Sequence, residues 1–161
     1  MRVLLTSLLL CLPTLGLAHG NTAHDPKPGT MGTLEIIETA FGRSGDPAKV
    51  VRTIEVRMGD DMRFVPQRLQ VRRGDTIRLR VVNRGRVMHE LVIGTEAELA
   101  RHAALMRKNP DMEHDAPYMA HVAPAKRGEI LWQFTQPGEF SFACLVPGHF
   151  EAGMRGTIVV K

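Results

Sequence analysis

Apolar residues alternate with polar or small ones in several short segments of the second half of the chain. The clearest segments are 77–81, 130–134, 140–144 and 158–160, in which every second residue is apolar. Such alternation gives a strand with one buried face and one solvated face. Turn-forming sequences at 59–61, 73–75, 83–85 and 137–138 separate the segments. Many short strands with this spacing predict an all-β protein, either an antiparallel sandwich or a barrel.

One segment departs from this pattern and predicts a helix. Thr95 is followed three residues later by Glu98, which is the signature of a capping box. Good helix formers continue to Lys108, and Pro110 lies just beyond. We therefore expect one short helix at about 96–108, followed by a polar loop at 109–124 that contains Met and His residues.

The N-terminus has the pattern of a secretory signal peptide. Arg2 precedes an apolar run, and small residues lead to Ala18, after which we expect cleavage and export to the periplasm. The apolar run is too short for a membrane span, so we expect none. Residues 19–49 are interpreted as a flexible extension with a possible short strand at 34–39, and 50–161 as the domain. Cleavage would remove Cys11 and leave Cys144 as the single cysteine, which cannot form an internal disulfide.

The balance of charge argues against a nucleic-acid partner. The chain has 21 Lys+Arg against 17 Asp+Glu. The arginines between 52 and 80 are spread along predicted strands and alternate with apolar residues. This distribution is typical of the solvated face of a sheet and differs from a basic patch.

The C-terminal part carries the chemistry. Cys144, His149 and Met154 follow the spacing C-x4-H-x4-M, and His89 lies upstream in an apolar run. Alternation places His89 and Cys144 on inward faces, where an imidazole and a thiol require a partner. A buried unreactive thiol is the alternative for Cys144 taken alone. Two imidazoles, a thiolate and a weak thioether together are the donors of an electron-transfer copper site.

These residues carry a resemblance to a known family. Residues 50–161 resemble the cupredoxins, the type 1 blue copper proteins, and the C-terminal block is the most specific part. The spacing is similar to the rusticyanin type, and the helix with its Met/His loop is similar to periplasmic cupredoxins linked to copper tolerance. The matching motifs are Phe64-Val65-Pro66, Leu69-Gln70-Val71, Gly74-Asp75, Asn83, His89, Pro137 to Cys144, Pro147-Gly148-His149 and Gly153 to Ile158.

The resemblance implies a Greek-key β-sandwich that holds one type 1 copper per chain and carries one electron. It implies that His89, Cys144 and His149 are equatorial ligands and that Met154 is axial. It also implies that a redox partner docks near His149. We expect the docking patch to consist of Leu145, Val146, Pro147 and Phe150, with Met88 beside them.

One residue departs from the family pattern. Many members have Asn directly after the first His ligand, where its side chain ties the two ligand loops together. Here that residue is Glu90. The sequence therefore does not predict this hydrogen bond, and the potential and colour of the site stay open.

A second, looser set of Met and His residues follows the predicted helix, and two interpretations of it stay open. The side chains could be gap-filling methionines and solvated histidines. They could instead form an accessory copper site, since thioethers suit Cu(I). His19 could contribute as a freshly exposed N-terminal residue, and His102 is interpreted as a surface residue. The accessory candidates are Met112, His114, Met119, His121 and His19.

Two functions fit these observations. The first is a periplasmic one-electron carrier that acts as a monomer. The alternative is a copper-handling protein that binds or oxidises copper and confers tolerance. We do not expect an enzyme or catalytic residues, because multicopper enzymes need clustered histidines and the sequence has no H-x-H pair. Zinc is disfavoured because a thioether is a poor zinc ligand.

Overall fold

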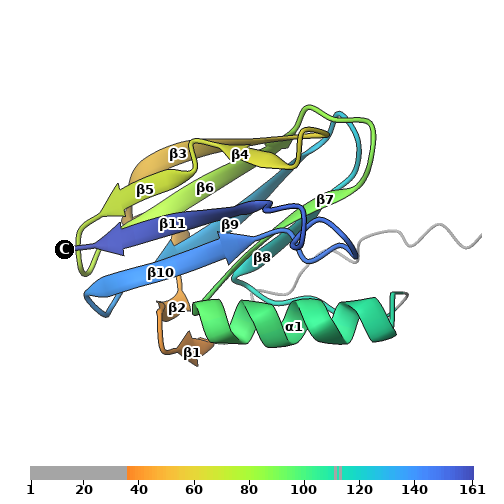
Figure 1. The fold of residues 1–161 in the computed structure, drawn as a ribbon. Helices are drawn as coiled ribbons and strands as arrows, with labels where there is room; N and C mark the ends of the chain where they lie inside the picture. Colours follow the sequence, from red (N-terminus) through yellow and green to blue (C-terminus); the bar gives the residue numbers. More distant parts are fainter. Residues whose placement is uncertain (1–35, 111, 113) are drawn as a thin grey trace, which may run out of the picture. The chain divides into compact units, whose positions relative to one another are not determined.

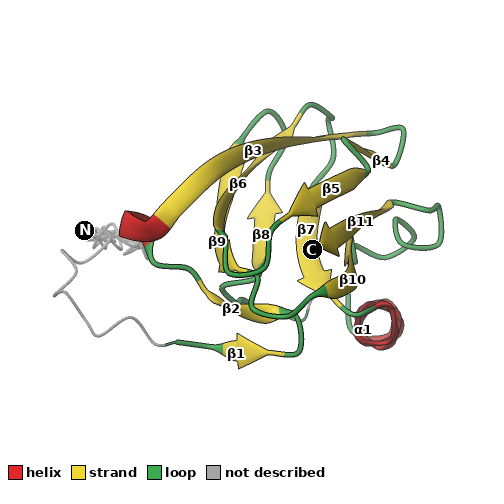
Figure 2. Cartoon of the chain, turned by 90° about the vertical axis from the view of Figure 1, so that its left-hand side faces the viewer, coloured by secondary structure: helices red, strands yellow, loops and turns green. Residues whose placement is uncertain are grey.

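The computed structural model describes residues 36–110, 112 and 114–161 (Figure 1). The predicted signal peptide and His19 lie outside these residues. The described chain forms two β-sheets that face each other, with one α-helix along the side (Figure 2). Within the described ranges, no helix has the length and apolarity needed to cross a membrane.

The first sheet has six strands and mixed strand directions. Strand β3 runs parallel to β6, whereas β6 pairs with β9 in antiparallel register. In spatial order the strands are β1 (Glu38–Thr39), β2 (Gly42–Ser44), β9 (Arg127–Gln133), β6 (Thr76–Asn83), β3 (Val50–Gly59) and β4 (Arg63–Val65).

The second sheet has five strands and supplies the candidate ligands. Strand β10 lies between β11 and β7 and is antiparallel to both, whereas β5 is parallel to β11. In spatial order the strands are β5 (Arg68–Val71), β11 (Arg155–Val160), β10 (Gly138–Ala143), β7 (His89–Gly94) and β8 (Met119–Val122).

The predicted β-sandwich is confirmed, with one correction to its strand directions. Alternate residues such as Ile77, Leu79 and Val81 are buried between the sheets, together with Trp132 and Phe142. The parallel pairs arise because the chain changes sheet between β4 and β5 and again between β5 and β6. Parallel strands need a crossover connection, and a period-two pattern does not show which strands such a crossing makes neighbours.

The predicted helix is confirmed as α1 (Glu96–Lys108). The Thr95 side chain accepts a hydrogen bond from the backbone N–H of Glu98, and the Glu98 carboxylate accepts one from the N–H of Thr95. Leu99, Ala103 and Met106 are buried and face β7 and β10. The helix therefore covers the outer face of the second sheet beside the ligand-bearing strands.

The predicted polar loop at 109–124 requires a correction, because part of it is strand β8. Met119 to Val122 pairs with β7, and its apolar residues are buried against the neighbouring layers. His121 is the one residue of the four that is exposed. Four residues are too few for alternation to distinguish a strand from a loop.

The predicted extension at 19–49 also requires a correction in its described part. Strand β2 pairs with β9, and β1 pairs with β2. Phe41 is buried, and its carbonyl accepts a hydrogen bond from the indole N–H of Trp132 at 3.2 Å. A short 3-10 helix (Pro47–Lys49) then leads into β3. Residues 36–49 are thus an ordered edge of the first sheet.

Candidate metal centre

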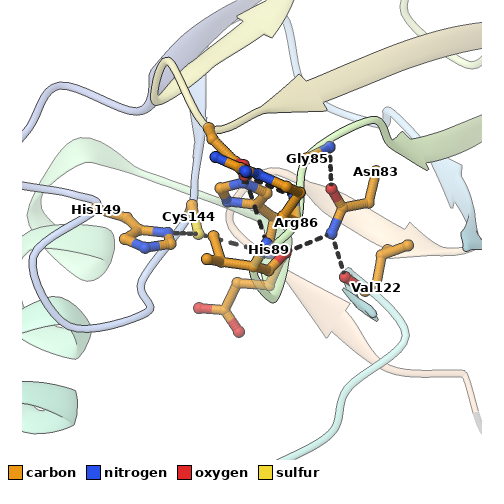
Figure 3. Close-up of polar contacts among 10 residues, drawn as sticks. Asn83, Gly85, Arg86, His89, Val122, Cys144 and His149 are labelled. Carbon is orange, nitrogen blue, oxygen red and sulfur yellow. Dashed lines mark hydrogen bonds and ion pairs between the residues drawn. The ribbon is translucent and has the colours of Figure 1, made fainter. Parts of the chain in front are cut away.

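Three potential ligands from two segments of the chain converge at one end of the sandwich. His89 begins β7, Cys144 directly follows β10, and His149 lies in the loop before β11. One donor atom from each lies within 4.8 Å of the others. The Cys144 Sγ and the His149 Nδ1 are 3.3 Å apart, and Figure 3 marks this contact by a dashed line. His89 and Cys144 are fully buried, whereas His149 is half-buried.

Backbone hydrogen bonds fix the loop that carries the C-x4-H-x4-M pattern. The N–H of Cys144 donates to the carbonyl of Met154 at 3.1 Å, so the two ends of the loop are joined. The N–H of Met154 donates to the carbonyl of His149 at 3.0 Å. Gly148 and Gly153 have φ values of +89° and +88°, which glycine adopts without strain. The loop therefore holds Cys144 and His149 in a fixed relation.

The His89 ring is oriented by a residue that the sequence did not single out. Its Nε2 lies 3.3 Å from the Asp60 Oδ1, which fixes the proton on that nitrogen. Hydrogen bonds from the backbone N–H of Arg86, and also the His89 ring, hold the pKa of Asp60 below its ordinary value. Asp60 lies in a sequence that signals only a turn, which concealed this role.

The loop before His89 is held by Asn83, which is buried at the end of β6. Its side-chain amide donates to the carbonyls of Val87 and Val122, both at 2.8 Å. Its side-chain oxygen accepts from the N–H of Gly85 at 2.8 Å (Figure 3). Asn83 thus joins the His89 segment to β8.

The donor atoms fit a metal ion. The His89 Nδ1 is buried and has no hydrogen-bond partner among the described residues, a costly arrangement for a polar atom. Burial raises the pKa of the Cys144 thiol to about 12, so metal binding would release its proton. Burial also lowers the pKa of His149, which favours the neutral imidazole that a metal requires. Two imidazoles and a thiolate are the equatorial donors of a type 1 copper site.

Glu90 ties the two ligand segments together, which the sequence left unpredicted. Its Oε1 accepts a hydrogen bond from the backbone N–H of Leu145 at 2.7 Å. Its own backbone N–H donates to the Cys144 Sγ at 3.4 Å. Glu90 is 1% exposed. Its carboxylate therefore provides the kind of connection that the family resemblance assigns to an Asn side chain.

Met154 is buried in the same core cluster as Cys144, and its backbone is joined to both Cys144 and His149. These contacts place Met154 beside Cys144 and His149. Its axial role remains a prediction from the resemblance.

The predicted docking patch requires a correction. Leu145 and Phe150 are buried in the cluster beneath α1, because the helix packs over them. Met88 is 46% exposed, Pro147 is exposed and Val146 is half-buried. The apolar surface beside the His149 loop thus has a different composition, and we define the apolar rim as Met88, Val146 and Pro147, which line one pocket.

The accessory candidates separate into two groups. His114 and His121 come together with Glu90, with one donor atom of each within 4.8 Å of the others, and Met112 lines the same pocket. Met119 packs beneath α1 instead, which corrects its assignment to this site. The sequence predicts a surface position for His102, whereas the structure shows it half-buried, with its ring 4.7 Å from that of His114.

The fold and the donor set together define a class: a β-sandwich protein that brings together two imidazoles and a thiol, the donor types of a type 1 copper site. A model of copper-binding proteins of the plastocyanin/azurin family matches residues 50–161. The chain belongs to this family, the cupredoxins, and is a copper-binding protein.

Among individual proteins, the chain is similar to copper-resistant cuproproteins named CopI. It is 48% identical over 156 residues to that of Rubrivivax gelatinosus, covering 95% of this chain and 94% of that protein. It is 32% identical over 151 residues to that of Pseudomonas aeruginosa, covering 76% and 83%.

Solved structures show the same fold. Auracyanin B matches with a TM-score of 0.63 at 24% identity, covering 75% of this chain and 96% of that one. The reduced auracyanin of Roseiflexus castenholzii matches with a TM-score of 0.60 at 21% identity, covering 70% and 98%.

Proposed function

We propose that this chain is an exported copper-handling protein that confers copper tolerance through its type 1 centre. The observation that carries the proposal is the 48% identity, over nearly the whole of both chains, to a protein named for copper resistance. The predicted signal peptide supports the proposal, because a protein that handles copper outside the cytoplasm must be exported.

The residues of the centre have separate tasks in this proposal. His89, Cys144 and His149 would hold one copper ion, with Met154 as a weak fourth donor. Copper bound there would supply one-electron chemistry between Cu(II) and Cu(I). The chain keeps His89 and Cys144 away from water and fixes the loop of His149 by backbone hydrogen bonds. A donor set held in this way changes little in position between the two oxidation states.

A second candidate function is electron transfer to a partner protein. The observation that favours it is the position of His149, the one half-buried member of the three-donor cluster. The apolar rim of Met88, Val146 and Pro147 would provide a contact surface for a redox partner. If the chain has this second function, the electron would leave the copper ion through the His149 imidazole, and the partner would dock weakly against the apolar rim.

The test is a deletion strain complemented with defined variants. The strain should become sensitive to copper while its respiration stays normal, and the wild-type gene should restore growth. Cys144→Ser should fail to restore it, because it removes the thiolate. Arg101→Ala, at an exposed helix position, should restore growth fully. Normal copper tolerance with impaired respiration would overturn the proposal in favour of the electron carrier.

A further inference from the structure

Three arginines contact the loop that carries His149 and Met154, which we call the ligand loop (residues 145–154). They come from separate parts of the fold: the start of β4, the last turn of α1 and the start of β11. The three residues that they contact are consecutive in the chain and lie directly after His149. The pairs are Arg155 with Phe150, Arg107 with Glu151, and Arg63 with Ala152.

The middle of the ligand loop is fixed against α1. Phe150 is buried beneath the helix, and the guanidinium carbon of Arg155 lies 4.2 Å from the centre of its ring. A nitrogen of Arg155 also lies 3.1 Å from a carboxylate oxygen of Glu96, in the first turn of the helix. In the last turn, Arg107 forms an ion pair with Glu151. Both ends of α1 are therefore connected to the loop (Figure 1).

The end of the ligand loop is held by Arg63, which belongs to the first sheet. Its Nη1 donates to the carbonyl of Ala152 at 3.0 Å and to that of Met62 at 2.8 Å. An added Cβ on Gly153 would lie 3.5 Å from the same nitrogen, so the guanidinium packs against this turn. Hydrogen bonds from charged donors are stronger than those from neutral ones. Arg63 therefore fixes the turn that immediately precedes Met154.

The β3–β4 connection contacts both segments that carry candidate ligands. Asp60, three residues before Arg63, has its Oδ1 3.3 Å from the His89 Nε2. Gly85 permits this approach, because a side chain there would overlap the Asp60 carboxylate. Through Asp60 and Arg63, one turn of the first sheet is thus joined to the His89 segment and to the ligand loop, which both belong to the second sheet.

We propose that Arg63, Arg107 and Arg155 are positioning residues that hold the ligand loop in its copper-binding shape. Copper leaves the centre only when a donor on this loop moves away, so a loop held from both sides releases the metal slowly. One exposed ion pair contributes little to the stability of a whole protein. Here the three contacts restrict the same short segment, so their effect falls on the donors and is small for global stability.

The test measures copper release from the full-length exported protein to an excess of chelator. Arg63→Ala should release copper about 3- to 10-fold faster than wild type, the size expected for the loss of one hydrogen bond. Its thiolate-to-copper absorption should also shift, because Met154 is held less firmly. Arg68→Ala is the matched control, since Arg68 pairs with Glu139 at the end of β10 remote from Cys144. A release rate and an absorption equal to those of this control would overturn the proposal.

Hydrogen exchange in the metal-free protein separates positioning from general stability. The backbone N–H of Met154 donates to His149, and Arg63→Ala should speed its exchange while exchange in β6 stays unchanged. Unchanged exchange at Met154, or faster exchange throughout the chain, would contradict the role of Arg63.

A triple variant tests whether the three arginines act on the same loop. Arg63→Ala/Arg107→Ala/Arg155→Ala should release copper faster than Arg63→Ala alone. An equal rate would overturn the roles of Arg107 and Arg155. None of these measurements depends on copper tolerance, so failure here is distinguishable from failure of the proposed function.

Discussion

Glu90 has two separate tasks because its two carboxylate oxygens face different neighbours. One oxygen satisfies the buried N–H of Leu145, and the other faces the imidazoles of His114 and His121. A buried carboxylate is costly unless hydrogen bonds or cations compensate for the loss of water. Glu90 therefore contacts both the loop that follows Cys144 and the histidine pair His114 and His121.

Glu90→Ala should lower the free energy of unfolding of the metal-free protein by about 1–3 kcal/mol, because the N–H of Leu145 is left buried without an acceptor. Glu90→Gln keeps a carbonyl oxygen for that N–H and should lose less. Urea unfolding of the metal-free proteins measures both. A Glu90→Ala protein as stable as wild type would show that this hydrogen bond contributes nothing.

Asp60 is positioned to orient His89, a predicted copper ligand. Asp60→Ala removes the acceptor that orients the ring, and we expect copper affinity to fall roughly 10- to 100-fold, as for other groups that position metal-bound histidines. Competition with a chelator of known affinity measures the change. Asp61→Ala is the matched control, because it removes a neighbouring exposed carboxylate. Equal affinity in the two variants would contradict the role of Asp60.

The sequence predicts some of these residues and conceals others for physical reasons. Cys144 and His149 are close in the chain, and alternation turned His89 and Cys144 inward, so their convergence was predictable. The tasks of Glu90 and Asp60 depend on contacts between distant segments. Glu90 meets His121 because of the β7–β8 register, and Asp60 meets His89 because β3 and β6 end side by side. Local patterns carry no information about such register.

At the scale of elements, α1 is a case in which a local sequence motif predicts the structure correctly. The capping box is formed by residues three apart, so it is visible in the sequence and present in the structure. Strand β8 shows the opposite case. Its four residues acquire their conformation from pairing with β7, and neither its length nor its composition distinguishes it from the loop before it.

Thr95→Ala should reduce the free energy of unfolding by about 1 kcal/mol, because the N–H of Glu98 loses its side-chain acceptor at the start of α1. Arg101→Ala, at an exposed position of the same helix, should change it by less than about 0.5 kcal/mol. Urea unfolding followed by circular dichroism measures both variants. Similar losses for the two would mean that the cap does not stabilise the helix.

At the scale of the whole molecule, the strand crossings bring the candidate ligands to one end. Strand β3 ends before Asp60, β7 begins at His89, and β10 ends before Cys144, all at the same end of the sandwich (Figure 1). Period-two alternation predicted two-faced strands but could not order them. The order of strands is what assembles a site from residues that are far apart in the chain.

Because only the folded chain assembles these donors, copper should stabilise it. Ligand that binds the native state alone adds about 4 kcal/mol when its concentration is a thousandfold above Kd. Copper-loaded protein should therefore have a higher melting temperature than metal-free protein, and a chelator should reverse the gain. Cys144→Ser should retain only the part of the gain that other copper sites supply. Scanning calorimetry measures these temperatures, and an unchanged melting temperature on loading wild type would contradict a centre that forms on folding.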